Sequence, residues 1–426
     1  MRINNNLMAM NTHRQLGQAQ QAGAKSMEKL SSGLRINRAG DDAAGLSISE
    51  KMRGQIRGLD QASRNSQDAI SLVQTGEGAL NETHAITQRM RELAVQSATD
   101  TNVNVDREAL QNEFDELTKE ISRIGETTEF NTQKLLNGDF DGTFQIGANE
   151  GQNISLEIND MRASALDLVG NAKTEVTGTI GSGLTADLQD GTYTIDGNNL
   201  RNSTGDIVAD NAAGDGLVWT GTGGDSDGSD FGDDTITFVQ GVDSGSITVS
   251  SGGTVATGTA EFDSAVEHQL EAGDYTVNDT QLLDGGGNII ATSVDATNYV
   301  SAKDGSTSVL TLDAATTGTE LNLSVGGVDI STQASADKAI TTVNSALESV
   351  SAQRSKLGAV QNRLEHTIKN LDTSSENLQA SESRIRDVDM AKEMMELTKQ
   401  NILQQASNAM LAQANNAPQS VLQLLG

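Results

Sequence analysis

Histidine and cysteine are the side chains that most often bind metal ions or act as nucleophiles, and this chain offers few of them. It has four histidines, His13, His84, His268 and His366, and no cysteine. No pair of histidines has the His-Glu-x-x-His spacing of the common zinc proteases, so they are interpreted as exposed or helix-face residues. The lack of cysteine excludes disulfides, thiolate zinc sites, iron–sulfur clusters and cysteine nucleophiles.

Two glycine- or aspartate-rich segments come close to known binding loops without matching them. Residues 181–186 fit a formal G-x-G-x-x-A pattern, but no helix is expected after them, as a dinucleotide site requires. Residues 225–234 have the composition of a calcium loop but lack the sixth-position glycine and the distal glutamate of an EF-hand. They are interpreted as an exposed acidic turn, with calcium binding as the alternative. The sequence therefore predicts no catalytic, cofactor-binding or metal site, and we do not expect an enzyme.

Charge and hydropathy exclude further classes of protein. The 426 residues include 29 basic and 59 acidic side chains, a net charge of −30, whereas a nucleic-acid-binding protein needs a basic footprint. No run approaches the ~18 apolar residues of a membrane-spanning helix. The first residues lack the apolar stretch of a secretory signal peptide. We therefore expect no nucleic-acid or membrane partner, and a protein that is either cytoplasmic or exported without a cleaved signal.

The negative charge is concentrated in one segment of the chain. Residues 171–335 carry 25 acidic and 3 basic side chains, a net charge of −22. Residues 1–170 have a net charge of −7, and residues 336–426 have −1. The sequence therefore predicts an acidic insert, rich in Gly, Thr, Ser and Asp, between two nearly neutral ends.

Both ends show coiled-coil spacing, in which apolar residues alternate at intervals of four and three. The pattern predicts one helix over residues 43–98, a second with Asp106 as its N-cap, and a third near the C-terminus. Such helices gain most of their stability by burying the apolar stripe against a partner, so we expect an antiparallel bundle. The predicted seam residues are Met52, Ile56, Leu59, Ile70, Val73 and Leu80, then Leu110, Phe114 and Leu117, then Val343, Leu347, Val350, Leu357, Leu364, Ile368 and Leu371.

The extreme termini are also predicted to be helical, and residues 388–425 carry apolar stripes on two faces. One interpretation is that these helices pack back on their own bundle. The other is that they are partly unpaired in the monomer and pack against other subunits, which their small, uncharged surfaces favour. The residues predicted to pack in such an inner core are Ile3, Leu7, Met394, Leu397, Ile402, Leu422 and Leu425.

Between residues 138 and 160 the apolar period changes to two. Residues 144–146 and 154–158 alternate around a Gly/Asn-rich turn, which predicts a β-hairpin. Short strands are predicted in the insert at residues 193–195, 235–239, 246–249, 275–277, 309–312 and 321–325. The expected fold class is α+β, with long terminal helices in an antiparallel coiled-coil bundle, a β-hairpin, and a mainly-β variable insert.

Several strings at both ends resemble those of the bacterial flagellins. They are MRIN at the start, SSGLRINRAGDDAAGL at residues 31–46, FNTQKLL at residues 130–136, LGAVQNRL at residues 357–364, and the stretch over residues 404–426. The resemblance covers roughly residues 1–165 and 335–426, in the order found in that family. The insert shows no such resemblance, and in flagellins this part varies most.

The resemblance implies a structural subunit of the bacterial flagellar filament that serves swimming motility. It implies export in an unfolded state by the flagellar type III apparatus, without a cleaved signal peptide, and an extracellular location. Residues 1–42 and 385–426 would be core helices that line the inner tube. Residues 43–170, with the hairpin, and 336–384 would form the helical wall, and residues 171–335 the outer β domain.

The resemblance also implies partners and contact residues. The partners are further copies of the chain in a helical homopolymer, an export chaperone, the filament cap, the hook-junction proteins and the vertebrate receptor Toll-like receptor 5. Residues 388–425 would bind the chaperone. Residues 88–95 resemble the segment that the receptor recognises, where Arg89 and Leu93, with Glu113 on the following helix, occupy the matching positions. The alternative role of these three residues is protofilament packing, and one surface can serve both.

Three other interpretations are open at this point. A hook–filament junction protein shares the terminal-helix design. The insert could carry a secreted hydrolase or a metal-dependent enzyme, which would need convergent His, Asp or Glu side chains, but its only histidine is His268. The insert could also be an adhesive or glycosylated surface, which its many Ser and Thr residues permit.

Overall fold

A computed structural model of the chain describes most of its residues. They are residues 6–180, 190–202, 204–214, 216–221, 235–242, 245–250, 255–262, 269–302, 307–313, 315 and 320–425, with side chains up to residue 416. Residues 181–186, residues 225–234 and His268 lie outside this set. The chain divides into two compact units, which are described one after the other.

The first unit, residues 1–70, 143–155 and 361–426, is mainly helical. It contains α1 (Leu7–Ser32), the start of α2 (Ala43–Ser97), the end of α4 (Gln333–Arg386) and α5 (Met390–Leu425). The helix predicted over residues 43–98 is confirmed. Arg386 pairs with Glu50 at 2.6 Å, and Ser375 Oγ donates to Asp60 at 2.9 Å. The residue number in α4 falls as the number of its partner in α2 rises, so these parts of α2 and α4 run antiparallel, as predicted.

The predicted β-hairpin is present as strands β3 (Asp141–Gln145) and β4 (Asn153–Glu157). Its turn contacts α2 in the first unit. A Cβ atom on Gly58 would lie only 2.8 Å from the Cβ atom of Ala148, so the helix needs a glycine where the turn approaches. The Asn65 amide donates to the carbonyl oxygen of Gln145 at 3.1 Å.

The second unit, residues 71–142 and 156–360, joins helices to a large β region. It contains the end of α2, the start of α4 and all of α3 (Asn104–Thr127), which is followed by the short strands β1 (Glu129–Phe130) and β2 (Gln133–Lys134). The prediction of Asp106 as N-cap is wrong, because the helix begins earlier and its N-cap is Val103. Asp106 lies in the first turn, where its carboxylate accepts a hydrogen bond from the Val103 N–H at 3.2 Å.

The predicted seam residues are all buried or half-buried. Val73, Leu80, Phe114, Val343, Val350, Leu357, Leu364 and Leu371 are buried. Met52, Ile56, Leu59, Ile70, Leu110, Leu117, Leu347 and Ile368 are half-buried. Burial at these positions agrees with the predicted stripes, and their role as a coiled-coil seam stays a prediction.

The β region is one antiparallel sheet of fourteen strands within the described residues. They are β5 (Val169–Ile180), β6 (Gly191–Asp196), β7 (Asn199–Arg201), β8 (Ile207–Asp210), β9 (Val218–Gly221), β10 (Thr235–Thr237), β11 (Ser246–Ser250), β12 (Val255–Phe262), β13 (Gly273–Asn278), β14 (Gln281–Asp284), β15 (Ile289–Thr292), β16 (Asn298–Ser301), β17 (Ser308–Thr311) and β18 (Glu320–Gly327). Strand β10 pairs with both β9 and β5, so the strands from β5 to β12 close into a ring. Strands β18 and β13 to β17 continue the sheet on the other side of β5.

All six strands predicted in the insert are present. The other eight strands of the sheet were not predicted: β5, β7, β8, β9, β12, β14, β15 and β16. The two longest of them are β5 and β12. Their buried positions hold small residues, such as Ala172 and Gly178 in β5 and Ala256 and Gly258 in β12. A Cβ atom on Gly178 would lie 2.7 Å from the Phe238 ring. Val176 and Phe262 are the only large apolar side chains at the buried positions of these two strands, so the alternation gives only a weak apolar signal. The predicted segment boundaries stay predictions; β5 begins at Val169 and α4 at Gln333.

Candidate functional site

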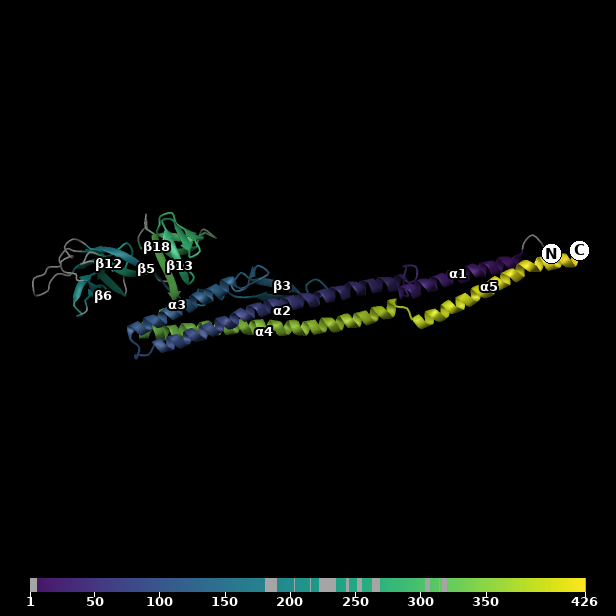
Figure 1. Cartoon of the computed structure of the whole chain (residues 1–426), viewed down its shortest axis with the longest axis horizontal. Coiled ribbons are helices and arrows are strands. Elements are labelled where there is room, and N and C mark those ends of the chain that lie inside the picture. The colour runs from purple at the N-terminus through teal and green to yellow at the C-terminus, as the bar shows by residue number, and fades with distance from the viewer. Residues whose placement is uncertain are drawn as a thin grey trace, which may run out of the picture. The chain divides into compact units, whose positions relative to one another are not determined.

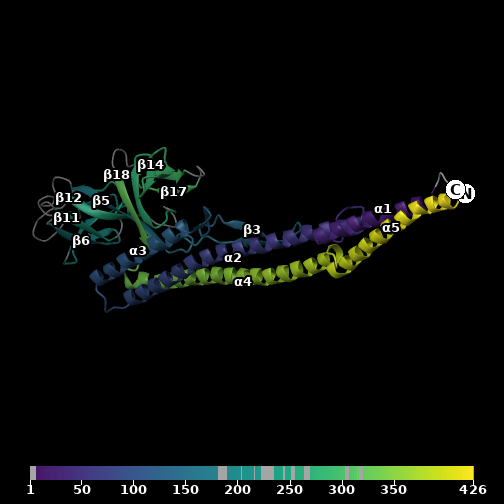
Figure 2. The same cartoon turned by 45° about the vertical axis from the view of Figure 1, so that its right-hand side comes forward.

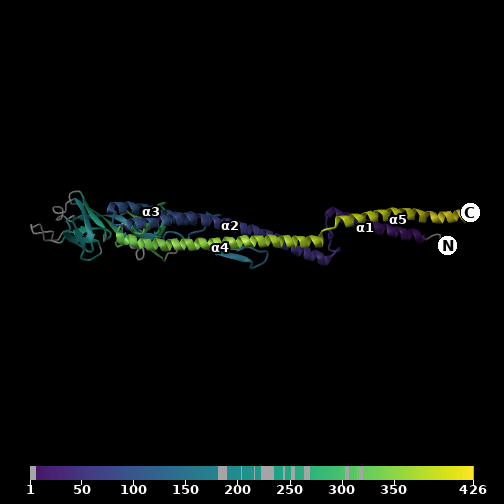
Figure 3. The same ribbon diagram turned by 90° about the horizontal axis from the view of Figure 1, so that it is seen from below.

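Helices α1 and α5 lie side by side in all three views (Figures 1, 2 and 3). The N-cap of α1 is Asn6, whose side-chain amide donates to the carbonyl oxygen of Ala414 in α5 at 2.6 Å. A Cβ atom on Gly23 would lie 3.1 Å from Nε2 of Gln404. The same amide donates to the carbonyl oxygen of Ala19 at 3.2 Å. Small residues and amide side chains therefore form this contact.

Many large apolar side chains of the same two helices are exposed. Of the nineteen exposed large hydrophobic residues in the described part of the chain, ten lie on α1 and α5. They are Leu7, Met8, Met10, Met27, Met390, Met394, Met395, Ile402, Leu403 and Met410. Leu7 is 70% exposed, Met395 68% and Ile402 60%. Single exposed apolar residues are normal, but a concentration of them marks an interaction surface.

The residues predicted to pack in an inner core belong to this exposed surface where their side chains are described. Leu7, Met394 and Ile402 are exposed, and Leu397 is half-buried. Ile3 lies outside the described residues, as do the side chains of Leu422 and Leu425. Inner-core packing of these residues stays a prediction, and it needs other subunits as partners.

The two segments that link the terminal helices to α2 and α4 are bonded to each other. Gly33 ends α1 in the left-handed conformation, and its carbonyl oxygen accepts from Val388 N–H at 3.0 Å. Arg35 N–H donates to the carbonyl oxygen of Arg386 at 2.7 Å. The Arg35 guanidinium also donates to the carbonyl oxygen of Ile385, near the end of α4. The two linkers are therefore held together by main-chain bonds.

Asp41 shapes the first linker. Backbone N–H groups of Arg38 and Asn37 donate to its carboxylate at 3.0 and 3.2 Å and hold its pKa below the usual range. Asn37 in turn donates to Ser32 Oγ at 2.8 Å. The string at residues 31–46 thus contains the side chains that fold this linker back onto the end of α1.

The predicted receptor-contact residues lie on α2 and α3, but only two of the three are on the surface. Arg89 forms ion pairs with Glu113 at 2.8 Å and with Glu92 at 3.1 Å. The carboxylates of Glu113 and Glu92 raise the pKa of Arg89. Leu93 is fully buried, which contradicts its assignment as a surface contact. It faces inward because it continues the buried stripe of α2 from Met90, so the exposed pair is Arg89 and Glu113.

Metal-binding side chains do not cluster in the described residues. No set of three or more His, Asp or Glu residues there could hold a metal ion. His13, His84 and His366 lie on α1, α2 and α4, and His84 contacts Gln88 at 2.9 Å. In the described part of the chain, no helix combines the length and the apolar character needed to cross a membrane.

Sequence reasoning missed the residues that join the two ends of the chain. Asn6 bonds to Ala414 and Arg35 to Ile385, across separations of 408 and 350 residues. No local period marks such contacts. The available signal was the resemblance of the string at residues 31–46, which contains Arg35.

The comparisons with known proteins agree at both ends of the chain. The bacterial flagellin N-terminal helical region matches residues 3–141, and the bacterial flagellin C-terminal helical region matches residues 340–425. A flagellin of Clostridium tyrobutyricum is 46% identical over 431 residues, which cover 98% of this chain and 100% of the relative. A flagellin of Halalkalibacterium halodurans is 42% identical, with 100% of both chains covered. Among solved structures, FliC from Burkholderia pseudomallei is 22% identical with a TM-score of 0.31, over 69% of this chain and 99% of that chain. This chain belongs to the bacterial flagellin family.

Proposed function

We propose that this chain polymerises through its terminal helices into the flagellar filament and thereby serves swimming motility. The observation that carries the proposal is the exposed apolar surface of α1 and α5. Burial of one large apolar side chain contributes about 1.5–3 kcal/mol, and ten such residues are exposed on these two helices. Contacts with neighbouring copies would bury this surface and offset the conformational entropy lost on ordering.

The route to the filament is part of the proposal. The chain is exported unfolded through the flagellar type III apparatus without a cleaved signal peptide, and it assembles under the filament cap next to the hook-junction proteins. Residues 388–425 bind the export chaperone before secretion. The exposed methionines of α5 support this, because flexible methionine-rich surfaces adapt to different partners. One surface would then serve the chaperone first and other subunits later.

A second proposed interaction is with Toll-like receptor 5 at the surface formed by Arg89 and Glu113. The support is the exposed ion-pair cluster on α2 and α3, together with the resemblance of residues 88–95. Buried Leu93 would act only by packing beneath these residues. The same cluster remains a candidate protofilament contact.

The experiment that tests polymerisation is negative-stain electron microscopy after seeded or precipitant-induced assembly. We expect long tubes of uniform width from the full chain, and a soluble, folded monomer without filaments when residues 390–426 are deleted. Ile402→Asp should also stop filament formation, because it places a charge in the exposed apolar surface. Gln405→Glu, a matched control at an exposed polar position, should still assemble.

The assembly test has clear contradicting outcomes. Normal filaments from the truncated chain, or from the Ile402→Asp variant, would contradict the proposal. Persistent monomers of the full chain at both low and high salt would favour a junction protein. Assembly at high salt alone would show instead that the charge of the insert opposes polymerisation.

A further inference from the structure

Helix α3 presents a second stripe, made of polar side chains, to the β region. Gln111, Asp115, Lys119 and Ser122 are spaced by four, four and three residues, so they share one face of the helix. Each of them bonds to the β region or to the segment that leaves it. The apolar seam of α3, Leu110, Phe114 and Leu117, runs beside this stripe, and the Phe114 ring also lies against Gly327 at the end of β18.

The first half of this polar stripe holds the end of β18. Asp115 accepts a hydrogen bond from Gly327 N–H at 2.8 Å. Gln111 accepts from Ile330 N–H at 2.6 Å and donates to the carbonyl oxygen of Val328 at 3.3 Å. A Cβ atom on Gly327 would clash with Oγ1 of Thr118, so the close approach of the strand to the helix needs a glycine here.

The second half of the stripe meets two carboxylates at the start of β13. Lys119 Nζ pairs with Asp274 at 3.1 Å. Ser122 Oγ donates to Glu271 at 3.1 Å. Asp274 also accepts from Ser324 Oγ of β18 at 3.0 Å. The stripe therefore contacts two neighbouring strands of the sheet.

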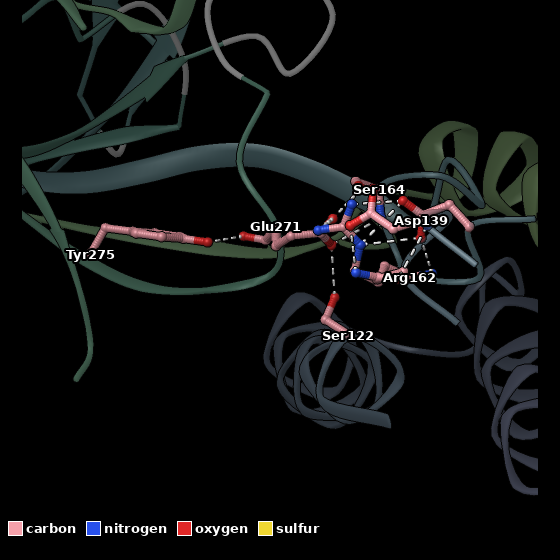
Figure 4. Close-up of polar contacts among 8 residues, drawn as sticks. Ser122, Asp139, Arg162, Ser164, Glu271 and Tyr275 are labelled. Carbon is pink, nitrogen blue, oxygen red and sulfur yellow. Dashed lines mark hydrogen bonds and ion pairs between the residues drawn. The ribbon is translucent and has the colours of Figure 1, made fainter. Parts of the chain in front are cut away.

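Glu271 is the centre of this second contact (Figure 4). Besides Ser122, its carboxylate accepts hydrogen bonds from the N–H and the hydroxyl of Ser164, and it pairs with Arg162 at 3.3 Å. Arg162 is fixed in turn by Asp160 at 2.6 Å. Tyr275 donates its hydroxyl to the carbonyl oxygen of Glu271 at 2.9 Å. The side chains of Glu271 and Arg162 are only 16% and 28% exposed, so water screens the pair less than a surface pair.

We propose that the polar stripe of α3 and the Glu271 cluster form a mount that holds strands β13 to β18 in one fixed orientation on α3. The partition of charge supports this. The insert, residues 171–335, has three basic residues against 25 acidic ones. The carboxylates of Asp274 and Glu271 pair with Lys119 and Arg162, which both lie outside the insert. This conformational device goes beyond filament assembly and is testable in the monomer.

The test measures the distribution of distances between two spin labels on the full-length chain by pulsed electron–electron double resonance. The chain has no native cysteine, so Asn112→Cys on α3 and Val294→Cys between β15 and β16, both exposed, can be labelled specifically. We expect a single narrow distribution in the parent. Glu271→Ala should at least double its width, because it removes the acceptor for Ser122, Ser164 and Arg162. Glu271→Gln, which keeps the hydroxyl contacts, should broaden it less.

A matched control separates the mount from general charge removal. Asp196→Asn breaks an ion pair of similar length, Asp196 with Arg201 at 2.8 Å, inside the β region. It should leave the distribution unchanged. Should Glu271→Ala fail to fold, Lys119→Gln combined with Asp274→Asn replaces it, with unchanged helicity by circular dichroism as a requirement. A broad distribution in the parent, or a narrow one in the folded cluster variants, would overturn the proposal.

Discussion

The terminal helices and the β region differ in where their large apolar side chains lie. The β region buries Trp219, Phe262 and Tyr299 within its own strands. The helix pair α1 and α5 is joined through Ala19, Gly23 and amide groups, and its methionines are exposed. A region that covers its own apolar surface can fold alone, whereas one that exposes it depends on partners. This difference supports the proposal that the terminal helices, and not the β region, form the assembly contact.

The charge of the two regions follows the same division. The acidic insert, residues 171–335, has a net charge of −22. Among the last 91 residues the net charge is −1. Close packing of many copies would be opposed by like charges, so a nearly neutral surface suits the region proposed to assemble.

The largest expected effect comes from truncating one apolar side chain in each region. Phe262→Ala in β12 leaves a cavity at a fully buried position and should lower the free energy of unfolding of the β region by about 3–5 kcal/mol. Met395→Ala in α5 changes an exposed side chain and should alter the monomer by less than about 0.5 kcal/mol. Urea denaturation followed by Trp219 fluorescence measures the first effect.

In filament assembly we expect the opposite order, with the larger effect from the exposed residue. Met395→Ala should raise the concentration needed for filament formation, measured by sedimentation, while Phe262→Ala should raise it less once folded protein is selected. Equal effects of the two substitutions on assembly would mean that the exposed methionines carry no special role.

The long helices could be predicted from sequence because their signal is local and repeated. Seam residues such as Val73, Leu80 and Leu364 recur every three or four positions, and each is large and apolar. Strands β5 and β12 escaped because small residues, such as Ala172 and Gly258, occupy the buried positions where the period would show. The fold class was therefore predictable, but not the closure of the ring through β5.

The candidate sites were less predictable because they depend on residues far apart in the chain. Resemblance identified Arg89 and Glu113, which do form an ion pair, but it could not show that Leu93 points inward. The spacing of Gln111, Asp115, Lys119 and Ser122 was visible, yet polar residues on a helix are usually solvated. Only the position of β18 and β13 shows that this stripe is a contact.

A smaller effect is expected from pH at the contact between α3 and β18. Burial raises the pKa of Asp115 against the opposing hydrogen bonds from Gln111 and Gly327, and Lys173 and Lys119 lower it. Because the folded-state pKa lies above the unfolded one, Asp115 contributes stability in acid, and this is lost as pH rises through the raised pKa. The free energy of unfolding of Asp115→Asn, relative to that of the parent, should therefore be higher at pH 7 than at pH 4.

This comparison requires the free energy of unfolding of both proteins at several pH values. One proton changes the slope by at most about 1.4 kcal/mol per pH unit. Glu108→Gln, an exposed acidic residue on the same helix, is the control and should show no such trend. A parent that gains stability relative to Asp115→Asn as pH rises from 4 to 7 would contradict the assigned direction.

The smallest effect per subunit, but one repeated along the filament, is expected from salt. Residues 171–335 carry a net charge of −22, and like charges repel over a Debye length of ~10 Å at 0.1 M salt and ~3 Å at 1 M. Filaments should therefore bundle more at 1 M salt, as measured by light scattering. Filament length should change little, because the proposed assembly contact is made by the nearly neutral terminal helices. Bundling that does not change with salt would show that the acidic surfaces do not face each other, and a strong change in length would show that charge also acts within the assembly contact.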